Sequence, residues 1–161
     1  MITISVAAAD YATSVALFAR EVWVEYYSPF LGFEPIDYML NKFQSAEQIS
    51  RDIKRGYTYY VAHDENRLVG YCAARLDEHS LFLSKLYIER SYRKQGLARK
   101  FFELLLQMAR EHDKSYIWLN VNKQNEAIAL YKHLGFVVTD AKVTDIGEGF
   151  IMDDYIMEYP I

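Results

Sequence analysis

A short basic segment near the middle of the chain has the residue types of an anion-binding turn. It consists of Arg93, Lys94, Gln95, Gly96, Leu97 and Ala98. The segment lies between an apolar run that predicts a strand and a longer run with helical spacing. The start of a helix presents unpaired backbone N–H groups and the positive end of the helix dipole, and both bind phosphate groups. The segment therefore predicts a phosphate site, although so short a motif also occurs in solvated basic turns.

The charge of the chain supports a small anionic ligand at this segment. The 161 residues carry a net charge of −4, but residues 89–100 carry +4 and the rest of the chain −8. Nucleic-acid binding needs an extended basic face, so we expect no nucleic-acid partner. A local positive region in an acidic protein instead indicates a small anion. Neither nucleotide motif, G-x-x-x-x-G-K-[ST] or G-x-G-x-x-G, is present.

The elements that position this turn predict one mixed α/β domain spanning residues 1–161. Alternating apolar residues predict strands, apolar residues three and four apart predict helices, and glycines and prolines separate them. Ser45 and Gln48 form a capping box, and Asn125 is a second helix-capping candidate. We expect strands at 2–6, 57–63, 67–76, 80–88, 115–121, 136–146 and 150–159, and helices from Asp10 to Ser28 and at 36–43, 45–54, 97–111 and 126–134.

Two blocks of the sequence resemble the acetyl-CoA-binding motifs of the GCN5-related N-acetyltransferase (GNAT) superfamily. The first, from Leu86 to Ala98, resembles a strand ending in L-Y-V-like residues followed by Q/R-x-x-G-x-G/A. The second, from Asn125 to Phe136, resembles N-x-x-A-x-x-L-Y-x-x-x-G-F. The first helices and the closing pair of strands also fit the order of the family. The resemblance therefore covers nearly the whole chain.

The resemblance implies a fold, a co-substrate and a set of binding residues. The fold is a twisted, mixed but mostly antiparallel sheet of about six to seven strands flanked by helices. The co-substrate is acetyl-CoA, with no metal. The backbone of Leu86, Tyr87 and Ile88 is expected to pair with the pantetheine arm like an added strand, with the Ile88 N–H toward the thioester oxygen. The amides of Arg93, Lys94, Gln95, Gly96, Leu97 and Ala98 are expected to hold the pyrophosphate, and Asn125 to contact the pantetheine arm.

Tyr131 is the candidate general acid in the second block. A phenol with a pKa near 10 is protonated at neutral pH and can donate to a departing thiolate. The same side chain is at helical spacing from Ala127 and Leu134, which is also the position of a core residue. Its place in the second motif favours the catalytic interpretation.

The acceptor is predicted to be a small cationic amine. The segments Tyr92–Leu97 and Ile117–Leu119 and the ending Gly147–Met157 are most similar to bacterial spermidine/spermine (polyamine) acetyltransferases of the sporulation-regulator type, with a departure at Phe150–Asp153. Residues 21–37 contain four acids and no base, and six acids follow from Asp140 onward. The alternatives are an acetyltransferase for a protein N-terminus, a lysine or an antibiotic amine, and a non-catalytic acyl-CoA sensor.

The general base is not identified by the sequence. An ammonium acceptor with a pKa near 10.4 must lose a proton before it can attack. Some relatives carry an acid on the strand before the pantetheine site, but residues 80–85 contain none. The candidates Glu25, Glu34, Asp37 and Glu78, or a chain of water molecules, therefore stay open.

Several features predict the setting of the protein. The single cysteine, Cys72, rules out an internal disulfide and favours the cytoplasm, where it is expected to be a buried core residue. The four histidines lack the spacing of a zinc site. No signal peptide or membrane-spanning run is recognised. Apolar strand edges at Phe136–Val138 and Tyr155–Met157 suggest a homodimer.

Overall fold

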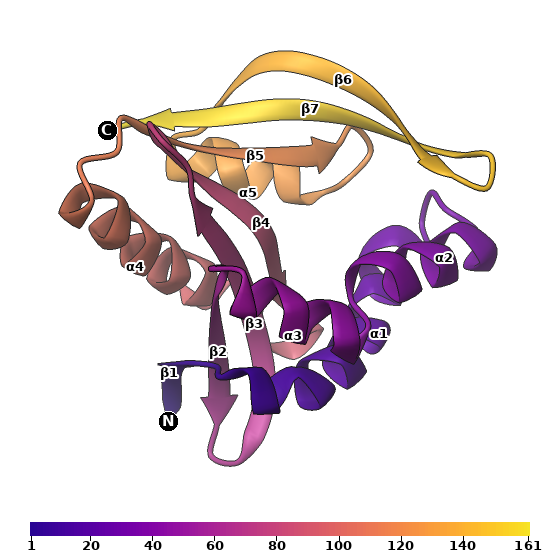
Figure 1. Ribbon diagram of the computed structural model, residues 1–161, viewed down its shortest axis with the longest axis horizontal. Helices are drawn as coiled ribbons and strands as arrows, with labels where there is room; N and C mark the ends of the chain where they lie inside the picture. The colour runs from indigo at the N-terminus through magenta and orange to yellow at the C-terminus, as the bar shows by residue number, and fades with distance from the viewer.

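The computed structural model describes residues 1–161, and its centre is one seven-stranded sheet (Figure 1). The strands are β1 (Ile2–Val6), β2 (Thr58–Asp64), β3 (Arg67–Leu76), β4 (Ser80–Ile88), β5 (Tyr116–Asn122), β6 (Val137–Gly147) and β7 (Phe150–Pro160). They lie in the order β1-β2-β3-β4-β5-β7-β6, and only the pair β4 and β5 is parallel. The prediction of a mixed, mostly antiparallel sheet flanked by helices is confirmed.

Helices cover both faces of this sheet. They are α1 (Ala12–Tyr27), α2 (Phe33–Phe43), α3 (Ala46–Lys54), α4 (Leu97–Glu111) and α5 (Ala127–Leu134), with short 3₁₀ turns η1 (Ala9–Tyr11) and η2 (Arg90–Tyr92). One core joins α1, α2 and α3 to the sheet, and the other joins α4 and α5 to its opposite face. Along β3, Tyr71 and Ala73 belong to the first core and Cys72 and Ala74 to the second, as the two-residue period of a strand requires. None of the helices has the length and apolar composition needed to cross a membrane.

The parallel strands β4 and β5 are paired over only part of their length. Their register joins residues 80–82 to residues 116–118 and then stops. Figure 1 shows the two strands starting together and then diverging. Beyond the last pair, Phe82 with Trp118, the edge of β4 that faces β5 has no strand partner. The sheet is therefore split at its centre.

Local sequence signals place most of the element boundaries. The strands at 67–76 and 80–88 and the helix at 97–111 have the predicted bounds. Ser45 Oγ accepts a hydrogen bond at 3.2 Å from the Gln48 N–H, as expected for the cap of α3. The prediction that Asp10 caps the first helix is wrong. Asp10 lies in η1, and α1 begins at Ala12 without a side-chain cap.

The second helix starts earlier than the pattern predicted. It was expected at residues 36–43 and begins at Phe33, so that Pro35 is in its first turn. The first turn of a helix has no intrahelical partners for its N–H groups, so a proline costs little there. Pro35 is therefore part of the start of α2 and not a loop residue.

The positions of β6 and β7 correct the predicted strand edges. β7 lies between β5 and β6, and Tyr155 is opposite both Val121 and Ala141. The prediction that Tyr155–Met157 forms a free edge is wrong, because both sides of that strand are paired. The strand at this end of the sheet with an open side is β6, on which Val137, Val138 and Val143 are 41–64% exposed.

Candidate active site

A groove of about 550 Å³ runs between the start of α4 and the side of α5. The turn before α4 forms one wall, with Lys94, Gly96 and Arg99. Ala127 and His133 belong to the α5 wall. The groove therefore lies where the basic segment of the sequence meets the second motif.

The turn before α4 combines an unusual backbone with open amides. Lys94 and Gly96 have positive φ values of 61° and 85°. A Cβ added at Gly96 would meet no atom within 4 Å. The hydrogen bonds of α4 begin with the Lys100 N–H, which donates to Gly96 O at 3.1 Å. The amides of Leu97 and Arg99, which come before it, have no helical partner and are open. These amides, with the exposed side chains of Lys94 and Arg99, suit a phosphate group.

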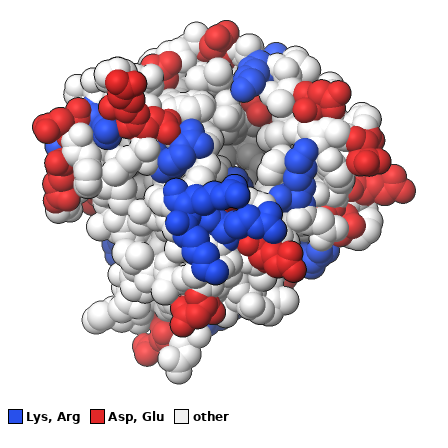
Figure 2. Space-filling model, viewed as in Figure 1, with Lys and Arg blue, Asp and Glu red and all other residues white.

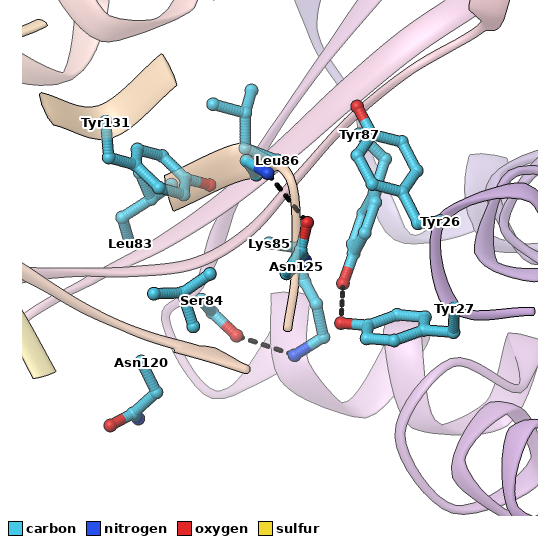
Figure 3. Close-up of a pocket in the computed structure, with 12 residues that line it drawn as sticks. Tyr26, Tyr27, Leu83, Ser84, Lys85, Leu86, Tyr87, Asn120, Asn125 and Tyr131 are labelled. Atoms are coloured by element: carbon cyan, nitrogen blue, oxygen red, sulfur yellow. Dashed lines mark hydrogen bonds between the residues drawn. The ribbon is translucent and has the colours of Figure 1, made fainter. Parts of the chain in front are cut away.

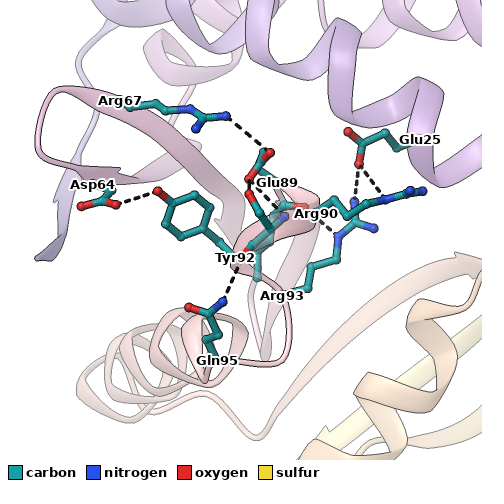
Figure 4. Close-up of polar contacts among 10 residues, drawn as sticks. Glu25, Asp64, Arg67, Glu89, Arg90, Tyr92, Arg93 and Gln95 are labelled. Atoms are coloured by element: carbon teal, nitrogen blue, oxygen red, sulfur yellow. Dashed lines mark hydrogen bonds and ion pairs between the residues drawn. The ribbon is translucent and has the colours of Figure 1, made fainter.

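Arg93 crosses the turn and does not add a free charge to the groove (Figure 4). Its Nε donates to Ile88 O at 2.9 Å, and its Nη2 pairs with Glu25 Oε2 of α1 at 3.1 Å. The guanidinium also lies 4.2 Å from the centre of the Tyr26 ring. The expected contribution of the Arg93 charge to the groove is therefore balanced by Glu25.

Gln95 and Tyr92 hold the same turn with their side chains, and Tyr92 also lines the groove. Gln95 Nε2 donates to Ser91 O at 2.8 Å, and Tyr92 Oη donates to Asp64 Oδ2 at 2.6 Å. In Figure 4 the Tyr92 hydroxyl points away from the loop that enters α4, toward Asp64, whereas the Gln95 contact lies within that loop. Gln95 itself does not line the groove, whereas its neighbours Lys94 and Gly96 do.

A smaller space of about 30 Å³ lies at the split between β4 and β5 (Figure 3). We call this space the throat. It is lined by Leu83–Tyr87 of β4, Asn120 and Val121 of β5, Tyr26 and Tyr27 of α1, and Asn125, Ala127 and Tyr131 on the α5 side. The groove and the throat share Tyr26 and Ala127, so the two spaces adjoin.

The open edge of β4 presents backbone groups to these spaces. Glu89 donates its N–H to Val69 O at 2.9 Å, so alternation along the strand turns the backbone groups of Ile88 and Leu86 away from β3 and toward the split. The Ile88 carbonyl already accepts a hydrogen bond from Arg93. Ile88 lines the groove and Leu86 the throat. An extended ligand chain could therefore bind here as an added strand.

Tyr131 and Asn125 meet at the throat from α5 and the loop before it. Asn125 is 8% exposed, and its Oδ1 accepts a hydrogen bond at 2.8 Å from the Ala127 N–H. Tyr131 is 7% exposed, and its ring packs edge-on against Phe136. Burial raises the pKa of Tyr131 well above its ordinary value, so its hydroxyl keeps its proton at neutral pH.

A second cavity of about 270 Å³ lies on the other side of the throat. We call it the helix-side cavity. Its apolar wall includes Trp23 and Leu31 of α1 and the following turn, and Met39 and Phe43 of α2. Its polar groups are Ser84, Lys85, Asn120, Asn122 and Asp154. It shares Tyr27, Ser84, Lys85, Tyr87 and Asn120 with the throat. Figure 2 shows a hollow on this face of the molecule with both basic and acidic side chains around it.

Two oxygen acceptors in the helix-side cavity lack protein partners. Asp154 is 5% exposed and makes no ion pair or side-chain hydrogen bond. Burial, and then the neighbouring Asp153 charge, raise the pKa of Asp154 to about 6. Asn120 Oδ1 is buried without a hydrogen bond. A buried acceptor without a hydrogen bond costs free energy. The Asp154 carboxylate and Asn120 Oδ1 therefore both fit a ligand that supplies N–H or O–H donors.

Lys85 is the one cation that lines both the throat and the helix-side cavity. Its Nζ donates to Ser84 Oγ at 2.8 Å, beside a bulge that leaves Ser84 without a partner on β3. Burial lowers the pKa of Lys85 to about 8.

The throat also contains a hydroxyl pair in which Tyr27 Oη and Tyr87 Oη are 2.8 Å apart. Burial raises the pKa of Tyr27 to about 12.

The family model for the acetyltransferase (GNAT) domain matches residues 31–155. That range contains the turn before α4, the split between β4 and β5, and Tyr131. The chain belongs to the GNAT acetyltransferase family.

Relatives and solved structures agree with this membership. Human N-acetyltransferase 8 is 30% identical over 128 residues, which are 75% of this chain and 52% of that protein. The chain thus spans about half the length of this relative. The *Escherichia coli* [ribosomal protein bS18]-alanine N-acetyltransferase is 39% identical over 62 residues, 38% of this chain and 40% of its own length. The PaiA N-acetyltransferase of *Thermoplasma acidophilum*, solved with coenzyme A, has a TM-score of 0.85 at 21% identity and covers 100% of this chain and 99% of its own, which shows a shared fold.

The GNAT site also shows where the predicted base candidates lie. Glu25 pairs with Arg93, and Asp37 pairs with Arg20 at 3.0 Å. Glu34 and Glu78 are exposed, and none of the four carboxylates lines the helix-side cavity. The acid that does line it is Asp154. One sequence signal could have found Asp154. Side chains alternate along a strand, so Asp154 is on the same side of β7 as Met152, and a charged residue therefore lies on the buried side of that strand.

No group of three or more His, Cys, Asp or Glu side chains in the structure could hold a metal ion. Cys72 is fully buried in the core against α4, and burial raises the pKa of its thiol. The thiol is therefore a poor nucleophile, as expected for a core residue.

Proposed function

We propose that the chain is an N-acetyltransferase that moves the acetyl group of acetyl-CoA to a primary amine, in one domain spanning residues 1–161. The observation that supports this most is that the groove, the throat and the helix-side cavity adjoin, because they share lining residues in turn. A phosphate-bearing thioester can enter from the groove and an amine from the opposite side. Bringing two reactants together in one geometry is a large part of catalysis of acyl transfer.

The groove and the throat have the features that CoA needs. The open space in front of Gly96 and the free amides of Leu97 and Arg99 suit the pyrophosphate, and Lys94 adds positive charge. The unpaired edge of β4 suits the amides of the pantetheine arm, beside Asn125. Acetyl-CoA supplies an acetyl group activated as a thioester.

Leu86 is the residue that we propose to bind the thioester oxygen. Its N–H faces the open edge of β4, and Leu86 lines the throat, whereas Ile88 lines the groove. The sequence resemblance suggested Ile88 for this role. A fixed N–H donor stabilises the negative charge that develops on a carbonyl oxygen during acyl transfer.

Tyr131 is proposed to protonate the departing thiolate. Its hydroxyl lines the throat from the α5 side and makes no hydrogen bond to another side chain. A hydroxyl that faces the throat without a protein partner is free to donate to a ligand or product atom. The raised pKa keeps the donor protonated over the whole neutral range.

A small cationic amine, such as a polyamine, is the acceptor that we propose. The Asp154 carboxylate and Asn120 Oδ1 are acceptors without protein partners, and an ammonium group supplies donors to both. The acidic residues 21–37 contribute less than their number suggests, because Glu25 and Asp37 are paired with arginines. The charge that favours a cation is therefore that of Asp154.

A peptide N-terminus is the second candidate acceptor, and Lys85 favours it. Its ammonium would repel an additional charge of a polyamine, but it can bind a carbonyl or carboxylate oxygen. The *E. coli* relative is named for acetylation of an alanine of ribosomal protein bS18. A peptide brings one amine and several carbonyl oxygens to the same cavity.

The proposed activity predicts release of CoA thiol when acetyl-CoA and a suitable amine are both present. The assay compares spermidine, spermine, amino acids, peptides with different N-termini and aminoglycosides at pH 7.5. We expect one class to exceed the hydrolysis rate by at least about 100-fold, since proximity and orientation act only on an acceptor that fits. Hydrolysis alone with every amine, together with tight CoA binding, would instead support the acyl-CoA sensor.

A homodimer through β6 is a further prediction. This strand has a free side and carries exposed valines at 137, 138 and 143. An exposed apolar edge strand is a typical site of association between copies. Light scattering at about 100 µM is expected to give twice the mass of 18.9 kDa. A monomer mass at that concentration would contradict the prediction.

A further inference from the structure

We propose that Asp154 is the general base of the reaction: its carboxylate takes a proton from the ammonium group of the acceptor in the helix-side cavity. This inference rests on the proposed acetyl transfer. It assigns the step for which the sequence left four carboxylates and a chain of water molecules open.

The first support is the position of the carboxylate. Asp154 lies on β7, opposite Asn122 of β5, and lines the helix-side cavity. That cavity shares five lining residues with the throat, among them Asn120 and Tyr27. An amine bound in the cavity can therefore meet Asp154 while it adjoins the space proposed for the thioester.

The second support is that Asp154 is a buried acid without a partner. Its neighbour Asp153 forms an ion pair with Lys123 at 3.0 Å, with half of its side chain exposed. Asp154 is 5% exposed and has no such pair. Asn120 Oδ1, also unpartnered, lines the same cavity. Two acceptors without donors on one cavity wall match the N–H groups of an ammonium ion.

The proton transfer balances as follows. The N–H bond of the acceptor ammonium breaks, an O–H bond forms on Asp154, and the amine keeps the electron pair with which it attacks the thioester carbon. The amide product forms as the carbon–sulfur bond breaks, and the thiolate takes a proton from Tyr131. The attacking nitrogen loses a second proton to solvent as the amide forms, and Tyr131 takes one up from solvent in exchange. Asp154 then releases its proton to solvent, so each turnover yields an amide, the CoA thiol and one proton.

The surroundings of Asp154 determine the pH range in which it can act. The charged and titratable groups that face it are Asp153 on β7, Lys142 opposite it on β6, Tyr27 on α1, and Tyr57, Lys85 and Tyr87 around the cavity. Burial and Asp153 raise its pKa to about 6, and Lys142 opposes them. Above pH 6 the group is a carboxylate, and it is a stronger base than an ordinary aspartate. Activity should therefore fall as the pH decreases through about 6.

The test is the pH profile of Asp154→Asn, with the chemical step measured in single turnovers in which enzyme exceeds acetyl-CoA. The acceptor is the best amine found for the wild type. We expect the rate at pH 7.5 to fall by about 10²- to 10³-fold and the decline near pH 6 to disappear. Asp154→Glu should restore part of the rate. A single-turnover rate within twofold of the wild type would overturn the assignment. So would a raised KM with an unchanged rate and an unchanged loss of activity near pH 6.

Asp153→Asn is the matched control, since it removes an adjacent charge outside the cavity. We expect it to keep the rate at pH 7.5 within about twofold and to move the decline to lower pH, because a like charge near Asp154 is lost. Lys142→Met should move the decline to higher pH. If neither variant moves the loss of activity near pH 6, the group that titrates there is not Asp154. This test does not depend on whether Asp154→Asn folds.

Failure of this inference can be told apart from failure of the proposed function. A wild type that turns over no amine contradicts the acetyl transfer itself. An active wild type whose Asp154→Asn variant keeps its rate contradicts only the base. Melting temperatures at pH 7.5 report folding separately. We expect Asp154→Asn to melt no lower than the wild type, because the variant removes an unpaired buried charge.

Discussion

Tyr131→Phe is expected to lower kcat by about 10²- to 10⁴-fold and to change the affinity for CoA by less than about twofold. The substitution removes the hydroxyl and keeps the ring that packs against Phe136. Without the donor, the thiolate must leave as an anion or wait for water. Stopped-flow detection of the thiol gives kcat, and calorimetry gives the dissociation constant for CoA.

Folding offers little reason for such a loss. The Tyr131 hydroxyl makes no hydrogen bond in the protein, so its removal leaves no partner unsatisfied. Tyr60→Phe is a matched control, because Tyr60 also packs on the core beneath α4 and α5 but lines neither the groove nor the throat. We expect this control to keep kcat and to melt within about 2 °C of the wild type.

The profile across pH separates catalysis from structure. A Tyr131→Phe variant that keeps more than half of the wild-type rate at every pH, with the best acceptor, would remove Tyr131 from the catalytic role. A small loss of stability with normal turnover is the pattern of a structural tyrosine. The large loss would also contradict the non-catalytic acyl-CoA sensor, since a sensor has no rate to lose.

The parts of the site that were predicted from the sequence are those made by neighbouring residues. The turn that ends at Gly96 follows a strand and starts a helix, so its charge, its glycine and its open amides are all local properties. Asn125, in the loop before α5, and Tyr131, within that short helix, are six residues apart and are likewise fixed by spacing. The mixed sheet follows from the order of the elements and from the two motifs.

The parts that were not predicted depend on contacts between distant segments. Arg93 was expected to add charge to the phosphate site, but it pairs with Glu25, which is 68 residues away. Asp154 becomes a cavity residue only because β7 pairs with β5 and α1 covers the same face. The alternation of side chains along β7 predicts on which side of the strand Asp154 lies. The sequence of β7 alone does not predict the cavity, which is formed by α1, α2 and β4.

Gly96→Glu is expected to raise the dissociation constant for CoA by at least about 100-fold. The space in front of Gly96 is open within 4 Å, and it is where we place the pyrophosphate. A carboxylate there would meet phosphate charge at close range. Two like unit charges 4 Å apart near a protein surface repel by about 4 kcal/mol, and about 1.4 kcal/mol is a factor of ten in affinity. Calorimetry with CoA at low salt measures the effect.

Two further variants separate charge from strain. Gly96 has a φ of 85°, which side chains rarely adopt, so any substitution there strains the backbone. Gly96→Gln has nearly the same shape without the charge, and we expect it to bind CoA more tightly than Gly96→Glu by about tenfold or more. Gly149→Glu places the same charge at a φ of 78° in the open turn between β6 and β7, and its affinity should equal that of the wild type. If Gly96→Glu and Gly149→Glu bind CoA alike, the pyrophosphate is not held at the start of α4.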